Sequence, residues 1–230
     1  MTEPDVALTD FALTVECAIL AGLVLQRVPR GAARAWAVAF FFSIGVAALL
    51  GGAVHGFFAS PDSAAHGVLW KAGMLAIGVT GLACWALGAQ LLAGPRGLRR
   101  VAAAGAVALP ALAFVVLFVS DDFLVAVLAY LPGVVFLLFA FLRRARVAHR
   151  VHRARRRSGA GGGAGDRAAI AGLLLTLLAA AGQQQRIALH PVHFTHNAVY
   201  HVLQGIALWL VYTGLRDALA REELPHADTT

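Results

Sequence analysis

Apolar segments of about 20 residues recur along the whole chain, and they carry very few charged residues. An α-helix rises 1.5 Å per residue, so about 20 residues are enough to cross a hydrocarbon layer of ~30 Å. The composition agrees, because 60% of the 230 residues are hydrophobic and only 13% are charged, against roughly 25% in soluble domains. The sequence therefore predicts a single-domain, all-α, multi-pass membrane protein.

The pattern predicts a bundle of seven transmembrane helices. Pro110 and Pro132 lie inside two of the predicted helices and predict kinks there. Cys17 and Cys84 lie in different spans and are typical of small packing residues rather than a disulfide. The predicted spans are residues 7–26, 35–59, 67–93, 101–119, 123–142, 168–189 and 193–215.

The basic residues follow the predicted topology. All of the 19 lysine and arginine residues except Lys71 and Arg186 fall in the loops after the first, third, fifth and seventh spans. Cytoplasmic loops of membrane proteins are enriched in such residues. The N-terminus is therefore expected outside and the C-terminus in the cytoplasm, and only an odd number of spans preserves this asymmetry. We expect the protein in the cell (inner) membrane.

The longest predicted loop, residues 143–167, is basic and ends in a glycine-rich stretch that is typical of a flexible linker. The net charge of +7 could suggest nucleic-acid binding. However, no aromatic residues are interleaved with the arginines, as a base-stacking platform requires. The arginines are instead typical of an anchor on anionic lipid. The expected partner is the lipid bilayer, and not nucleic acid.

Polar residues that are costly in lipid gather in the outer half of the predicted bundle. Glu16 and His201 lie ~12 Å from the outer face at the helical rise, and His55 lies near the outer end of the second span. The pair Gly51-Gly52 before His55 allows close approach by another helix. Because an ionisable residue inside a membrane indicates function, we predict a site on this side. Gln184, Asn197 and Tyr200 are assigned to the same side of the bundle, and Asp10 and His196 are expected nearer its outer rim.

Helical spacing limits which of these side chains can converge. Asn197, His201 and Gln204 share one helix face, because steps of three and four residues return to the same side. His196 pairs with Tyr200 on the neighbouring face. His196 and His201 are about 140° apart around a regular helix, so they converge only if the winding loosens into a π-type turn.

One interpretation of this layer is a catalytic zinc site. His55, His196 and His201 would bind Zn²⁺ with water in the fourth position, which is the catalytic arrangement. Glu16 or Asp10 would then act as general base or orient a ligand. The sequence contains no HExxH or Cys/His pattern, so the ligands would have to come from distant spans.

The residues leave other interpretations open. The layer can be non-enzymatic and bind or pass a small ligand, protons or solutes, or its hydrogen bonds can simply hold helices together at ~0.6 kcal/mol each. Axial haem ligation by His55 and His201 is a third interpretation. A retinal protein is disfavoured, because the only lysine, Lys71, lies at the outer end of the third span and cannot form the Schiff base expected in the seventh.

The topology, His55 in the second span and the histidines of the seventh resemble the superfamily of alkaline ceramidases and progestin and adipoQ receptors. The runs 42–45 (Phe-Ser-Ile-Gly) and 51–57 (Gly-Gly-Ala-Val-His-Gly-Phe) are similar to its second span. The resemblance implies a membrane hydrolase that binds zinc through one histidine of the second span and two of the seventh. Carried over to this sequence, the zinc ligands would be His55, His196 and His201.

The sequence departs from that pattern in three places. The family has a serine one turn before the second-span histidine, where this chain has Gly51 and the nearest serine is Ser43. Its seventh-span histidines are separated by three residues rather than four, and Lys71 stands where the family has an acidic residue. Asp10 and Glu16 are similar to the acidic N-terminal region of the ceramidases.

The leading hypothesis is therefore a zinc-dependent hydrolase of an amide or ester bond in a membrane lipid. In this hypothesis the three histidines bind the metal and Glu16 or Asp10 serves as the base. The residues expected to contact the substrate or to orient the ligands are Ser43, Gln184, Asn197 and Tyr200.

Overall fold

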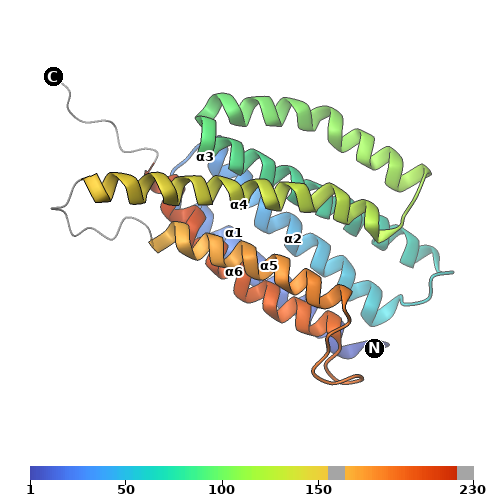
Figure 1. Cartoon of the computed structure of the whole chain (residues 1–230). Coiled ribbons are helices and arrows are strands. Elements are labelled where there is room, and N and C mark those ends of the chain that lie inside the picture. Colours follow the sequence, from blue (N-terminus) through green and yellow to red (C-terminus); the bar gives the residue numbers. More distant parts are fainter. Residues whose placement is uncertain (155–163, 222–230) are drawn as a thin grey trace.

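A computed structural model describes residues 1–154 and 164–221, which form six α-helices (Figure 1). Each of the six is long and apolar enough to cross a membrane, judged by length and composition. The prediction of an all-α chain is confirmed, and the apolar helices agree with a multi-pass membrane protein. The helices are α1 (Pro4–Arg27), α2 (Ala32–Phe57), α3 (Ala64–Phe118), α4 (Phe123–Ala154), α5 (Ala164–Gln184) and α6 (His196–Arg221).

The described residues contain six helices and not the predicted seven, because two predicted spans, 67–93 and 101–119, lie within α3. The backbone of α3 is non-helical at Gly94, where φ is 61° and ψ is −154°. Glycine adopts a positive φ without the steric cost of a Cβ atom, and the following Pro95 disfavours helical geometry in the residue before it. The chain therefore reverses at one residue without any loop that would separate two helices.

The two halves of α3 run side by side in opposite directions (Figure 1). A Cβ atom on Gly78 would meet the side chain of Leu112, and one on Gly105 would meet the side chain of Leu82. Glycines of one half therefore lie against leucines of the other. The paired residues lie at similar distances along the sequence before and after Gly94. This pairing is that of an antiparallel hairpin.

Local residues explain where the helices begin and end. α1 ends at Arg27 because Val28 is extended and precedes Pro29. At the start of α4, the carboxylate of Asp122 accepts a hydrogen bond of 2.8 Å from the backbone N–H of Leu124, as N-capping residues do. α4 then continues to Ala154, beyond the predicted end at residue 142. The middle of the predicted basic loop lies outside the described residues.

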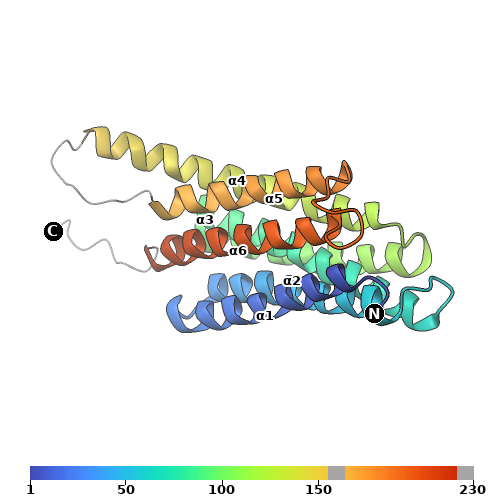
Figure 2. The same ribbon diagram turned by 90° about the horizontal axis from the view of Figure 1, so that it is seen from below.

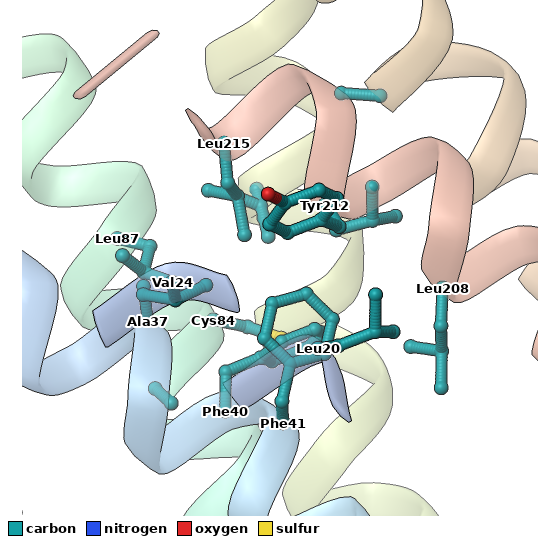
Figure 3. Close-up of a cluster of buried hydrophobic side chains, with 14 of the residues drawn as sticks. Leu20, Val24, Ala37, Phe40, Phe41, Cys84, Leu87, Leu208, Tyr212 and Leu215 are labelled. Carbon is teal, nitrogen blue, oxygen red and sulfur yellow. The ribbon is translucent and has the colours of Figure 1, made fainter. Parts of the chain in front are cut away.

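The buried core joins all six described helices through apolar side chains (Figure 3). Phe41 lies at its centre, with ring centroids 5.0 Å from Phe40 and 6.3 Å from Tyr212 in edge-on contacts. Cys17 and Cys84 are buried and free, so the prediction that they are packing residues is confirmed. Many other large apolar side chains face outward, such as Val107 and Phe118, which are 73% and 75% exposed. Hydrocarbon would cover such a surface in a membrane.

Two glycines let α3 and α4 approach closely. A Cβ atom on Gly81 would lie 2.5 Å from the carbonyl oxygen of Ala129, and one on Gly133 would lie 2.5 Å from the carbonyl oxygen of Gly81. Both obstacles are backbone atoms, which cannot turn aside as a side chain can. Small residues commonly mark such contacts between membrane helices.

We therefore expect Gly81→Ala to destabilise the fold by about 1–3 kcal/mol, the usual cost of overpacking. Gly22→Ala in α1 is the matched control, because a Cβ atom there has nothing within 4 Å. The measurement is thermal unfolding of the purified variants in detergent. Equal stability of the two variants would contradict the close contact between α3 and α4.

Candidate functional site

Asp10 of α1 and His201 of α6 meet inside the bundle. The Nε2 atom of His201 lies 3.3 Å from Oδ1 of Asp10, and the two side chains are only 12% and 6% exposed. The other ring nitrogen, Nδ1, lies 3.1 Å from the hydroxyl oxygen of Thr9. Both ring nitrogens of His201 thus contact consecutive residues of α1, Thr9 and Asp10.

Glycines of α2 make the space that Asp10 occupies. A Cβ atom on Gly51 would lie 3.1 Å from Oδ2 of Asp10, and one on Gly52 would lie 3.1 Å from Asp10 Cβ and 2.9 Å from the ring of Phe11. Larger residues at these positions would push α1 away from α2. The close approach predicted for Gly51-Gly52 is therefore confirmed, and its consequence is a carboxyl group placed between α2 and α6.

Two tautomers of neutral His201 satisfy its contacts with Thr9 and Asp10. The single Thr9 hydroxyl hydrogen can go to the backbone carbonyl oxygen of Asp5 at 2.8 Å or of Val6 at 2.9 Å, in which case the hydroxyl oxygen accepts from Nδ1–H of His201. A neutral imidazole with hydrogen on Nδ1 has only an acceptor at Nε2. In that tautomer, the contact with Asp10 needs one further proton, on either the ring or the carboxyl group. In the other tautomer, Nε2–H faces the Asp10 carboxylate and Nδ1 accepts from the Thr9 hydroxyl, so no further proton is needed.

A second pair of an acid and a histidine lies at the start of α1. Nδ1 of His55 lies 2.6 Å from Oε2 of Glu3, whose side chain is half-exposed. The backbone N–H of Glu3 also donates to the carbonyl oxygen of His55 at 3.1 Å. The first residues of the chain are therefore fastened to the end of α2, and one nitrogen of His55 faces a carboxylate.

Asp5 sets the register between α1 and α6. Its Oδ2 atom accepts hydrogen bonds from the backbone N–H of Thr195 at 2.9 Å and from the Thr195 hydroxyl at 2.7 Å. Thr195 directly precedes α6, so this bond fixes where α6 begins beside α1. The next contacts, Asp10 with His201 and Glu16 with Gly205, follow further along both helices in the same order. α1 and α6 are thus parallel neighbours.

The remaining predicted residues lie at different places in the bundle. Ser43 is buried and its hydroxyl oxygen lies 2.7 Å from that of Thr80 in α3. Asn197 accepts a hydrogen bond of 3.0 Å from Gln183, whereas the predicted Gln184 is exposed at the end of α5. The ring of Tyr200 packs edge-on against His201, with centroids 5.5 Å apart.

The three predicted zinc ligands are not gathered. Among residues 1–154 and 164–221, no group of three or more His, Cys, Asp or Glu side chains is placed to hold a metal ion. Both ring nitrogens of His201 have partners on α1, and His55 is paired with Glu3. His196 lines a cleft where α1 and α6 begin, and neither His55 nor His201 lines it. The donor set therefore does not fit a three-histidine zinc centre in this arrangement, and zinc stays a prediction.

A cleft of about 300 Å³ lies between α1 and α6. Thr9, Glu16 and His201 are its polar residues, and the rest of its lining is apolar, including Ile206 and Trp209. Oε1 of Glu16 is buried without a hydrogen-bond partner, and a Cβ atom on Gly205 would lie 2.5 Å from its Oε2. The Oε2 atom of Glu16 therefore lies against the backbone of α6 at Gly205.

A second cleft, of about 400 Å³, lies where α1 and α6 begin. Its titratable lining residues are Glu3, Asp5, His193 and His196. Two of these, Glu3 and Asp5, already have the partners described above. This second cleft thus lies closer to the first residues of α1 and α6 than the buried pair of Asp10 and His201 does.

Sequence reasoning missed Thr9, Glu3 and Asp5. A threonine one residue before Asp10 is a common helix residue, and Glu3 and Asp5 precede the first predicted span. The roles of Thr9 and Asp5 arise from the parallel register of α1 and α6, which links positions about 190 residues apart in sequence. Glu3 instead meets His55 of α2. No local pattern reveals such a contact.

One family model, described as a family of unknown function (DUF6962), matches residues 6–220. The matched region includes Asp10, Glu16 and His201, and it extends over nearly the whole helical bundle. No curated protein matches the chain, and no solved structure matches it. The chain therefore belongs to this family of unknown function.

Proposed function

We propose that the protein crosses the cell (inner) membrane seven times, with its N-terminus outside and its C-terminus in the cytoplasm. The support is the path of α3, whose 55 residues would extend to ~80 Å as one straight helix. That length far exceeds a hydrocarbon thickness of ~30 Å, whereas each half of the hairpin is long enough to cross the hydrocarbon layer once. The reversal at Gly94 lies at the same end of the bundle as the end of α6 (Figures 1 and 2).

Cysteine labelling tests this topology. Asp62→Cys, before α3, and Asp121→Cys, after it, are expected to react with a membrane-impermeant maleimide added to intact cells. Arg96→Cys, beside the reversal, is expected to react only after the membrane is permeabilised. The native cysteines give little background because both are buried. Labelling of residue 96 from outside would contradict two crossings within α3.

We further propose that the protein binds a small amphiphilic ligand in the cleft between α1 and α6, where the pair of Asp10 and His201 exchanges a proton with it. The observation that carries this proposal is the Asp10–His201–Thr9 contact on the wall of that cleft. A volume of about 300 Å³ is at the lower limit of small-molecule sites, which are mostly apolar with a few convergent polar groups.

The entrance of the cleft supports a ligand that arrives from the lipid. Val202, Ile206 and Trp209 border it on α6, and they are 45%, 52% and 44% exposed. These side chains face the surface that hydrocarbon would cover. An alkyl chain can therefore enter sideways while its headgroup reaches Thr9, Glu16 or His201.

Photolabelling tests the ligand site. A photoreactive dodecyl amphiphile is expected to label α1 and α6 around the cleft in protein reconstituted into lipid nanodiscs. Ile206→Trp fills the entrance and should reduce this labelling about tenfold, since it removes space rather than a single contact. Leu178→Trp is the matched control, because Leu178 is 68% exposed on α5 and is not part of the cleft. Equal labelling of the two variants would refute the site.

The second candidate function is zinc-dependent hydrolysis of a lipid amide or ester. It is favoured by the Asp10 carboxyl group beside His201, since carboxyl groups often orient metal-binding histidines. The carboxylate on one nitrogen of His55 is also common around metal-binding histidines. Metal analysis separates the candidates: stoichiometric zinc that both His55→Ala and His201→Ala remove would favour the hydrolase.

A further inference from the structure

Glu16 is an ionisable group without a partner in the described part of the chain. Its Oε1 atom is buried and unbonded, and the nearest element is the backbone of α6 at Gly205. The cleft around it contains no lysine or arginine. The one imidazole in the cleft, that of His201, is already engaged by Thr9 and Asp10.

An isolated carboxylate in apolar surroundings is strongly disfavoured, so Glu16 must take up either a proton or a cation. The cleft, of about 300 Å³, offers room for the cation beside the Glu16 carboxyl group. Trp209 lies one helical turn further along the same face of α6 and also lines the cleft. Its ring can contact a cationic headgroup or the first methylene groups of a tail.

From the carboxyl group of Glu16, the open volume of the cleft beside it and the apolar walls, we infer that the cleft selects an amphiphile with an ammonium headgroup. Glu16 forms the ion pair with this headgroup, and the alkyl tail lies along Ile206 and Trp209. This inference rests on the proposed ligand binding in the same cleft. It adds a charge preference, since a neutral headgroup leaves Glu16 unpaired and a carboxylate headgroup repels it.

Competition among three matched amphiphiles tests the preference. Dodecylammonium, dodecanol and dodecanoate are added to the full-length protein in phosphatidylcholine nanodiscs, and each is measured by displacement of the photoreactive dodecyl probe after correction for partitioning into lipid. Wild-type protein is expected to bind dodecylammonium about tenfold more tightly than dodecanol, because only the first forms an ion pair. Dodecanoate is expected to compete most weakly.

Two variants assign the preference to Glu16. Glu16→Gln is expected to reduce the ratio between dodecylammonium and dodecanol to about one, because the amide carries no charge. Gly205→Ala is expected to lower the same ratio by displacing the carboxyl group, since the added Cβ atom would lie 2.5 Å from Oε2. Asp62→Asn controls for loss of a carboxylate, and Gly182→Ala controls for the added methyl group because nothing lies within 4 Å there.

The outcomes separate this inference from the proposed function. Equal wild-type affinity for dodecylammonium and dodecanol would overturn the ammonium preference but leave ligand binding in the cleft intact. A preference that persists in Glu16→Gln and Gly205→Ala would overturn the role of Glu16. Failure of all three amphiphiles to displace the probe would overturn both the inference and the proposed function.

Discussion

The contact between Asp10 and His201 is the interaction on which the other features of the site depend. An apolar bundle tolerates a carboxyl group and an imidazole only when each satisfies the other, and here the two come from the first and the last helix. Their pairing holds α6 against α1 and fixes the depth at which Thr9 and Glu16 face the same cleft. The same contact therefore forms part of the polar site and holds the first and last helices together.

Small residues make this arrangement sterically possible. Gly51 and Gly52 leave room for Asp10 beside α2, and Gly205 leaves room for Glu16 beside α6. Asp10 and Glu16 therefore each lie against glycine backbone of a neighbouring helix. This geometry leaves Asp10 enclosed by two helices, whereas Glu16 opens into a cleft that a ligand can reach. The different surroundings give the two carboxyl groups different roles in our proposal.

The sequence predicted the helical class, the buried free cysteines and the close approach at Gly51-Gly52, because apolar length, burial and small size are local properties. It also singled out Asp10 and His201, since ionisable residues in apolar runs are conspicuous. It did not predict that they pair, because the register of α1 on α6 depends on Asp5 and Thr195 in the flanking segments. The helix count differed because Gly94 reverses the chain without a loop, which the spacing of apolar runs cannot reveal.

The central claim is that the Asp10 carboxyl group lies in direct polar contact with Nε2 of His201. Solid-state NMR of the protein in lipid, with ¹⁵N-labelled histidine and ¹³C-labelled aspartate, measures this contact through nitrogen–carbon dipolar recoupling, and the His201→Gln variant identifies the signal. We predict a separation of about 4 Å between the ring nitrogen and the carboxyl carbon, as hydrogen-bond geometry requires. The absence of a recoupled signal that depends on both Asp10 and His201 would contradict this contact.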